Sequence, residues 1–275
     1  MQLKTIVTFI IIAIFLSSCN LREKEEKKAD EQLKRIEQLI NDGKYNDAKS
    51  AIDTIHLLFP KLVNKRKIAV AYKDTIVRRE SSAILANSLQ ILPAKQQEHD
   101  SLLKDFKLEK NEKYQQFGNY VYKSQITEQN TSRNYLKFYV DENADLYLTS
   151  SVIGNKIEHF AIQLTTNNLS VATDTLNRKG VFHQFTDEGL YRENLTLKNE
   201  SDSTLAAFVA NNLTQKIKVV LIGKKKFSYY LSDQDKKAIA ATYQFWIVKR
   251  DLRILQKEIE KATVRIGNIK LRYQN

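Results

Sequence analysis

The feature that most constrains the fold is a regular apolar repeat at the C-terminal end of the chain. Apolar side chains recur there at alternating spacings of three and four residues, at Ala238, Ala241, Phe245, Val248, Leu252, Leu255, Ile259, Ala262, Ile266, Ile269 and Tyr273. This spacing aligns them in one stripe along a single α-helix. The sequence therefore predicts a helix over residues 232–275, about 60 Å long at 1.5 Å per residue, which begins with a capping box formed by Ser232 and Asp235.

An apolar stripe of this length must be covered by another helix. Helices from the N-terminal part of the same chain can return antiparallel against it, or a second copy of the chain can supply the partner in a coiled coil. Alanines within the stripe favour close packing inside one chain. In that arrangement the residues between the two helical parts form an insertion carried on a helical stalk.

Residues 31–117 are predicted to supply the helical partner. The stretch "INDGKYNDAKSAIDTIHLLFP" resembles the second half of a tetratricopeptide repeat, with Gly43 at the turn, Ala48 at the close approach of two helices and Pro60 at the helix end. Only one copy is present, so we expect a helical hairpin within a bundle. A longer helix is expected to end at Pro93, followed by another helix that includes Phe106. Apolar residues recur every seven positions on the longer helix, at Val63, Val70, Val77, Ile84 and Ile91.

Residues 118–231 change to the alternating pattern of β-strands. "NYLKFYVDENADLYLTSSVIG" alternates apolar and polar residues around a turn at residues 141–145. Similar runs follow, at "HFAIQLTT", "LSVATDTL", "GVFHQFT", "GLYRENLTL", "TLAAFVANN", "KIKVVLIG" and "KFSYYLS". About nine or ten short strands indicate an antiparallel β-sandwich or a related layout. The predicted fold class is therefore α+β, a helical bundle or stalk with an inserted antiparallel β-sandwich-like domain.

The N-terminal segment has the layout of a secretory signal. Lys4 precedes an apolar run, residues 6–16, that is too short to span a membrane, which takes about twenty residues. The residues Leu16-Ser17-Ser18-Cys19 resemble the lipobox of bacterial lipoproteins. This resemblance implies that residues 1–18 are removed as a signal peptide and that Cys19, the only cysteine, is acylated and anchors the protein to membrane lipid. The charged residues 19–30 are expected to form a tether or a frayed helix start.

Two details bear on location and on partners. Asn20 differs from the aspartate that retains enteric lipoproteins in the inner membrane, so an outer-membrane location is favoured, with the face of that membrane left open.

The net charge of +12 is spread over all parts of the chain, and the compact basic cluster Lys224-Lys225-Lys226 is typical of a solvated turn. Proteins that bind nucleic acid concentrate basic residues on one face, so we expect no nucleic-acid partner.

Few residues indicate chemistry. His56 and His99 have no histidine or cysteine at metal-ligand spacing. His159 and His183 fall in predicted strands and are candidate ligand-site residues if the fold brings a carboxylate close to them. The candidate carboxylates are Asp174, Asp187, Glu188 and Glu193. Six aromatic residues can either form a platform that stacks on sugar rings or lie in the core: Tyr229, Tyr230, Tyr135, Phe138, Tyr139 and Tyr147. No nucleophile elbow or phosphate-binding loop is present. The sequence therefore predicts no catalytic residue, no metal and no cofactor.

Two stretches, "KYQQFGNYVYKSQ" and "YVDENADLYLTSSVIG", resemble uncharacterised envelope lipoproteins of the Bacteroidetes. This resemblance implies a location in the cell envelope and no particular activity. We therefore expect a lipid-anchored, non-enzymatic binding or scaffolding protein that presents its β-domain to an envelope protein or a glycan. The alternative is a carbohydrate-binding lipoprotein that uses the face of the β-sandwich, and a hydrolase is the least favoured.

Overall fold

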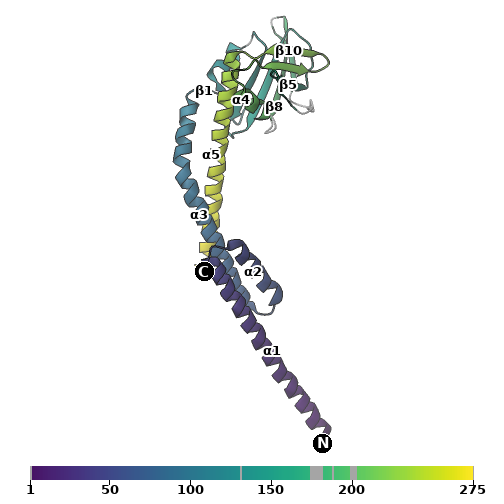
Figure 1. The fold of residues 1–275 in the computed structure, drawn as a ribbon, viewed down its shortest axis with the longest axis vertical. Coiled ribbons are helices and arrows are strands. Elements are labelled where there is room, and N and C mark those ends of the chain that lie inside the picture. Colours follow the sequence, from purple (N-terminus) through teal and green to yellow (C-terminus); the bar gives the residue numbers. More distant parts are fainter. Residues whose placement is uncertain (1, 131, 174–181, 188, 199–202, 275) are drawn as a thin grey trace. The chain divides into compact units, whose positions relative to one another are not determined.

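The computed structural model describes residues 2–130, 132–173, 182–187, 189–198 and 203–274, with side chains from Arg22 onward except that of Asp187. Within these ranges the chain forms five α-helices, two short 3-10 helices and ten strands in two antiparallel sheets (Figure 1). The chain divides into two compact units. We call them the helical unit (Met1–Ser88 and Glu258–Asn275) and the sheet unit (Leu89–Lys257). The predicted α+β class, with a long C-terminal helix and antiparallel sheets, is confirmed.

The helical unit begins with the hairpin of α1 (Gln2–Asn41) and α2 (Tyr45–Leu58). Gly43 has a φ of 74°, and the N–H groups of Gly43 and Lys44 bond the carbonyls of Ile40 and Leu39, which is a Schellman motif. Glycine adopts this left-handed conformation without strain. The apolar core of the unit comes from three helices and their connection, through Ala29, Leu33, Ile36, Ile40, Ala48, Ile52, Ile55, Phe59, Leu62, Ala69 and Ile76.

The predicted tether is helical. Helix α1 runs without a break through residues 19–30. Its side chains from Arg22 to Lys28 are mostly exposed, and Ala29 is the first to be fully buried. In the part of the chain that the structure describes, no helix combines the length and the apolarity needed to cross a bilayer.

Helices α3 (Val63–Leu103) and α5 (Asp233–Arg272) run antiparallel to each other. In the helical unit, an Arg272 nitrogen lies 2.9 Å from Asp74 Oδ1, and the Ser88 hydroxyl lies 3.5 Å from Glu258 Oε2. In the sheet unit, Lys95 Nζ lies 3.6 Å from Asp251 Oδ2. Residue numbers rise along α3 as they fall along α5 in each unit. The α5 stripe is buried at Ala238, Phe245, Val248, Leu252, Ala262 and Ile269.

The helical prediction is wrong at its C-terminal end. Pro93 lies inside α3, which continues to Leu103, and Phe106 begins strand β1 (Phe106–Glu109) instead of lying on a further helix. A proline inside a helix costs about 3 kcal/mol. The side-chain contacts of α3 with α5 continue past Pro93, so tertiary packing offsets this local cost. The strand region therefore begins at β1, before the predicted residue 118.

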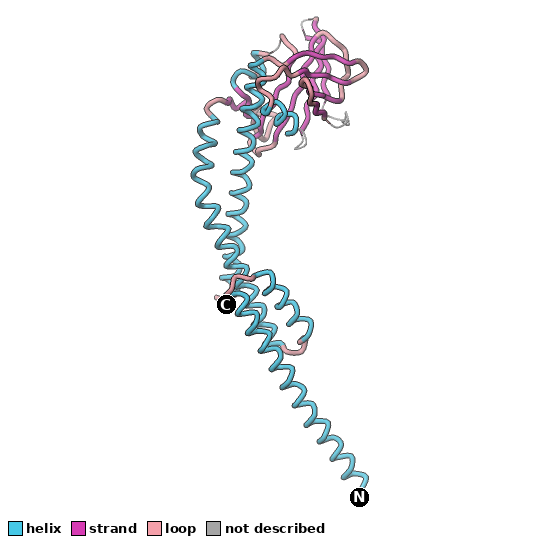
Figure 2. The backbone as a smooth tube through the Cα atoms, viewed as in Figure 1, coloured by secondary structure: helices cyan, strands magenta, loops and turns pink. Residues whose placement is uncertain are grey.

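The sheet unit contains two antiparallel sheets (Figure 2). The six-stranded sheet has the order β1-β2-β3-β4-β8-β7 and the four-stranded sheet the order β10-β9-β5-β6. Two 3-10 helices, Lys123–Gln125 and Thr127–Gln129, lie in the connection from β2 to β3. The strands after β1 are β2 (Asn119–Tyr122), β3 (Tyr135–Asp141), β4 (Leu146–Ile153), β5 (Ala161–Thr165), β6 (Ser170–Ala172), β7 (Phe182–Asp187), β8 (Leu190–Lys198), β9 (Lys218–Ile222) and β10 (Lys226–Tyr230).

One apolar core holds the sheet unit together. Side chains of both sheets contribute to it, and so do Phe245 and Trp246 of α5. The run "TLAAFVANN", expected as a strand, is instead helix α4 (Ser203–Asn211), which buries Leu205, Ala206 and Val209 on one helical face. The buried strand residues of this core are Phe106, Leu136, Phe138, Val140, Leu146, Leu148, Val152, Ile162, Leu164, Leu195, Leu197, Val219 and Leu221.

Candidate functional site

The outer face of the six-stranded sheet carries a polar cavity of about 520 Å³, which we call the outer cleft. Strand β3 shows why it forms there. Leu136, Phe138 and Val140 point into the core and are fully buried, so Lys137 and Tyr139 point to the opposite face. Residues of β1, β2, β4 and the connection from β2 to β3 complete the walls.

Cross-strand pairing aligns the polar side chains of the outer cleft. Lys137 of β3 lies opposite Thr149 of β4, and Tyr139 lies between Val121 of β2 and Tyr147 of β4. The rings of Tyr139 and Tyr147 stack with their centroids 5.1 Å apart and an interplanar angle of 1°. Side chains that share one face of paired strands are close neighbours, so lysine, threonine and tyrosine form a continuous polar and aromatic floor.

Lys137 is the unusual residue of this floor, because only 7% of its surface is exposed. Its Nζ donates a hydrogen bond of 2.7 Å to the Thr127 hydroxyl, which donates one of 3.1 Å to Glu109 Oε2. The backbone N–H of Thr127 also donates to Glu109, at 3.2 Å. Nζ lies 5.6 Å from the centroid of the Tyr139 ring, within cation–π range. The lysine therefore reaches Glu109 only through a hydroxyl group.

The electrostatics of the floor follow from its burial. Burial lowers the pKa of Lys137, although the charges of Glu109 and Glu128 act in the opposite direction. Burial also raises the pKa of Tyr139 to about 12, so its phenol stays protonated at neutral pH. The outer cleft thus presents an amine, a phenol, hydroxyls and amides at fixed positions.

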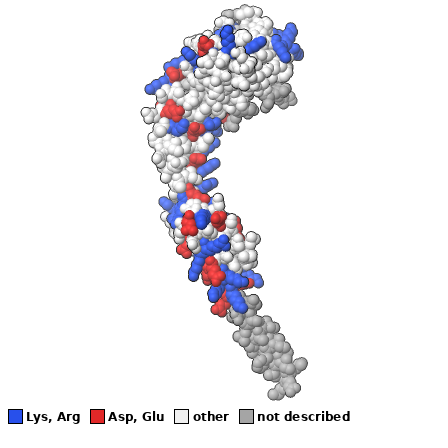
Figure 3. Space-filling model, viewed as in Figure 1, with Lys and Arg blue, Asp and Glu red and all other residues white. Residues whose placement is uncertain are grey.

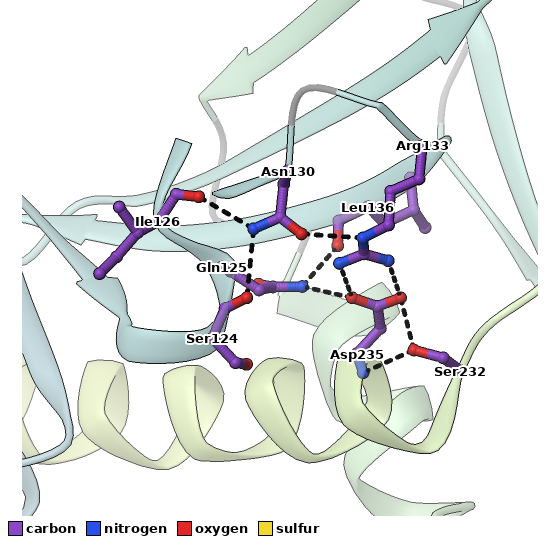
Figure 4. A network of polar contacts seen from close by, with 8 residues as sticks. All are labelled: Ser124, Gln125, Ile126, Asn130, Arg133, Leu136, Ser232 and Asp235. Atoms are coloured by element: carbon purple, nitrogen blue, oxygen red, sulfur yellow. Dashed lines mark hydrogen bonds and ion pairs between the residues drawn. The ribbon is translucent and has the colours of Figure 1, made fainter. Parts of the chain in front are cut away.

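A buried polar network holds the connection that forms one wall of the outer cleft (Figure 4). Arg133 makes a bidentate ion pair with Asp235 in the first turn of α5, at 2.6 and 2.7 Å. Gln125 donates to Asp235 at 3.1 Å, and Asn130 accepts from Arg133 at 2.8 Å. Since Thr127 lies between Gln125 and Asn130, this network positions the hydroxyl that Lys137 contacts.

The same network contains the predicted N-terminus of α5. The Ser232 hydroxyl accepts the Asp235 N–H at 3.0 Å and donates to its carboxylate at 2.8 Å. The Asp235 carboxylate binds Arg133 and Gln125 in addition, so it links the helix start to the sheet. Burial acts to raise the pKa of Asp235, but the hydrogen bonds from Arg133, Ser232 and Gln125 outweigh it and hold the pKa below its ordinary value.

The structure brings His159 together with Glu193, one of its candidate partners. Both side chains are fully buried, and a ring nitrogen of His159 bonds the carboxylate. That carboxylate also accepts the backbone N–H groups of Ile157, Glu158 and His159 at 2.8–3.1 Å. Burial acts to raise the pKa of Glu193, but its bonds to His159 and Glu158 hold it below its ordinary value. The pair is a structural contact between β8 and the segment before β5.

The backbone around this pair is tightly fitted. Glu158 has a φ of 52°, which turns three successive N–H groups toward one point, an arrangement known as a nest. A Cβ atom added to Gly223 would lie 2.4 Å from the carbonyl oxygen of Ile157. The carboxylate on one side and the glycine on the other therefore fix the segment that leads from β4 of one sheet to β5 of the other.

The other sequence candidates do not come together as a site. His183 is exposed on β7, opposite Asn194. Tyr229 and Tyr230 point to opposite sides of β10: burial strongly raises the pKa of Tyr229, while Tyr230 is 63% exposed. Asp174, Glu188, and the side chains of Asp187 and Cys19 lie outside what the structure describes. Among the described residues, no group of three or more histidine, cysteine or acidic side chains is placed to hold a metal.

A second cavity lies in the helical unit, where His56 accepts a hydrogen bond of 3.2 Å from Arg66. This apolar groove, of about 430 Å³, is lined by Val63, Val70 and Ala71 and bordered by Arg66 and Lys67. Val63 is 56% exposed and Val70 43% exposed. The residues that recur every seven positions thus leave part of their apolar surface open.

Comparison with known proteins adds no family to these observations. No protein-family model matches the chain, and no curated protein matches it significantly. The outer cleft is therefore interpreted from its own geometry. The sequence identified Tyr139 as a candidate but missed Lys137, Thr127 and Glu109. The available signal was the alternation in "YLKFYVD", which puts Lys137 on the same face as Tyr135 and Tyr139.

Proposed function

We propose that this protein is a lipid-anchored binding protein of the bacterial envelope, without enzymatic activity, and that its outer cleft holds a glycan. The observation that carries the glycan proposal is the lining of the cleft. Amide side chains of Asn111, Gln115 and Asn119 surround the floor made by Lys137 and Tyr139. Sugar hydroxyls both donate and accept hydrogen bonds, and amide, hydroxyl and amine groups complement them.

A glycan array probed with the mature chain tests this proposal. We expect binding to a restricted group of oligosaccharides and at least a tenfold loss with Asn119→Ala, since Asn119 lines the outer cleft. Ser228→Ala is the matched control, because Ser228 is exposed on β10 of the other sheet. Absence of any glycan ligand, or equal loss with both variants, would refute the proposal.

The membrane anchor is proposed from the lipobox resemblance of Leu16-Ser17-Ser18-Cys19. Two or three acyl chains on one residue satisfy the requirement that stable anchoring needs more than one chain. Cys19→Ala should abolish metabolic labelling with palmitate and release the protein from the membrane fraction. Ser17→Ala keeps a small residue and should remain labelled. Labelled Cys19→Ala protein would disprove the anchor.

A second candidate function, binding of a partner protein, is favoured by the apolar groove of the helical unit. An amphipathic helix can cover the exposed surfaces of Val63 and Val70. A photo-crosslinking amino acid at Val70 should give a discrete adduct in intact cells, whereas the same group at Ser82, an exposed position of α3, should not. Identical adducts at both positions would count against a specific partner. The fully buried His159–Glu193 pair gives no support to the hydrolase alternative.

A further inference from the structure

Amines and carboxylates both line the outer cleft. Its walls include the amines of Lys107, Lys110 and Lys137 and the carboxylates of Glu109 and Glu128. Lys110 is paired with Glu112, at 3.3 Å. Glu109 accepts both the hydroxyl and the backbone N–H of Thr127. The Glu109 carboxylate is therefore already engaged by hydrogen-bond donors of the protein.

Lys137 is the group that this arrangement leaves without a direct counter-ion. Among the described residues, its Nζ forms no ion pair with a carboxylate, and its hydrogen bond goes to the neutral hydroxyl of Thr127. An ammonium group has three donors, so capacity remains for an acceptor inside the cavity. A buried charge is unfavourable unless it is paired and hydrogen-bonded. A ligand that brings a carboxylate to Nζ supplies both a counter-ion and a hydrogen-bond acceptor.

The surroundings of Lys137 hold its amine in place. The Nζ atom lies over the Tyr139 ring, and Thr127 is held by the bonds that its backbone N–H and its hydroxyl donate to Glu109. A preorganised amine loses little freedom when a ligand binds. A charge-assisted hydrogen bond is also stronger than a neutral one.

We propose that the glycan held in the outer cleft is acidic, and that the carboxylate of a uronic acid or a comparable acidic sugar pairs with Lys137. This inference rests on the proposed function, because it names the class of glycan for the same site. Lys107, exposed at the edge of the cleft, adds long-range attraction for such a ligand. Binding should weaken as ionic strength rises, since salt screens this attraction.

Isothermal titration calorimetry with a matched pair of ligands tests the inference. Trigalacturonic acid and its fully methyl-esterified form have the same sugar rings and differ in their carboxylates. We expect the wild-type chain to bind the acid at least tenfold more tightly than the ester. Lys137→Met should lose most of the preference for the acid, because only the long-range attraction of Lys107 remains. Lys137→Arg should keep a larger part of the preference, and Lys225→Met, in the exposed turn between β9 and β10, should behave as wild type.

The outcomes separate this inference from the proposed function. If the ester binds as tightly as the acid, or if only neutral oligosaccharides bind, the glycan is not recognised by its charge. In that case only the inference fails. If no acidic or neutral oligosaccharide binds, the glycan-binding function fails as well. Trp246 fluorescence checks that Lys137→Met is folded, because Trp246 is 4% exposed in the core of the sheet unit. The comparison of acid with ester on the wild-type chain decides the question even if that variant does not fold.

Discussion

Removing the Asp235 carboxylate should destabilise the sheet unit strongly. Asp235 is 2% exposed and accepts hydrogen bonds from Arg133, Gln125 and Ser232. Asp235→Ala leaves the Arg133 guanidinium without its carboxylate partner and the Gln125 amide with one bond fewer. The helix start at Ser232 keeps its bond to the backbone N–H of residue 235, so the loss arises mainly from the network between α5 and the sheet.

The size of the effect follows from the burial of each partner. Breaking a fully buried ion pair costs about 3–5 kcal/mol. The Arg133 side chain is 36% exposed and can be rehydrated when its partner is lost. We therefore expect Asp235→Ala to lower the free energy of unfolding by about 2–4 kcal/mol. Asp235→Asn keeps an acceptor oxygen and should lose less.

Urea denaturation followed by Trp246 fluorescence measures this loss. Trp246 is the only tryptophan and lies in the core of the sheet unit, so its signal reports on that unit. Gln234→Ala is the matched control, because Gln234 lies in the same helical turn but is exposed. The control should leave the unfolding midpoint nearly unchanged. Equal shifts in both variants would mean that the helix terminus, and not the buried network, carries the stability.

The same carboxylate predicts a pH dependence. The pKa of Asp235 is lowered in the folded chain, whereas an unfolded aspartate titrates at about 3.9. Its contribution is therefore complete above about pH 4 and is lost as the pH falls through the lower folded value. Asp235→Asn should be less sensitive to acid than wild type across this range. An identical acid sensitivity of the two proteins would contradict the linkage argument.

Glu193→Ala removes the carboxylate that accepts the N–H groups of residues 157–159 and contacts the His159 ring. It should lower the free energy of unfolding of the sheet unit by about 3–5 kcal/mol in the same urea assay. A loss below about 1 kcal/mol would show that water replaces the carboxylate. Gly223→Ala should lower the melting temperature in circular dichroism, because the added Cβ meets the Ile157 carbonyl at 2.4 Å and overpacking costs about 1–3 kcal/mol. Gly267→Ala meets no atom within 4 Å on α5 and should raise stability by about 0.5–1 kcal/mol; shifts of the same sign at both glycines would contradict this reasoning.

The long-period patterns of the sequence predicted most of the fold. The stripe from Ala238 onward needed only helical spacing, and the β3–β4 hairpin needed only alternation around residues 141–145. Secondary-structure predictions from local sequence failed where tertiary contacts determine the conformation. The run "TLAAFVANN" contains residues common in strands, but Leu205, Ala206 and Val209 bury a helical face, and Pro93 stays inside a helix that packs against α5.

The candidate site was less accessible to sequence reasoning. Alternation places Lys137 on the outer face, where a lysine is ordinarily solvated, so nothing in β3 alone indicates that it is buried. The connection that carries Thr127 contacts Lys137, and Glu109, which accepts from Thr127, lies on β1, a segment that the sequence predicts as helix. Arg133 and Asp235 are 102 positions apart, and no local pattern relates them.

The nest that encloses Glu193 also sets an order of events during folding. Residues 157–159 leave the ribosome well before Glu193, which follows Ile157 by 36 positions, and until then their N–H groups have no carboxylate to bind. The left-handed backbone at Glu158 is unfavourable without that acceptor. Closing such a long loop early carries an entropic cost. We therefore expect β5 to take its place in the four-stranded sheet only after β8 has paired with β4. One side chain of the six-stranded sheet thus supplies the acceptor for the segment that leads into the four-stranded sheet.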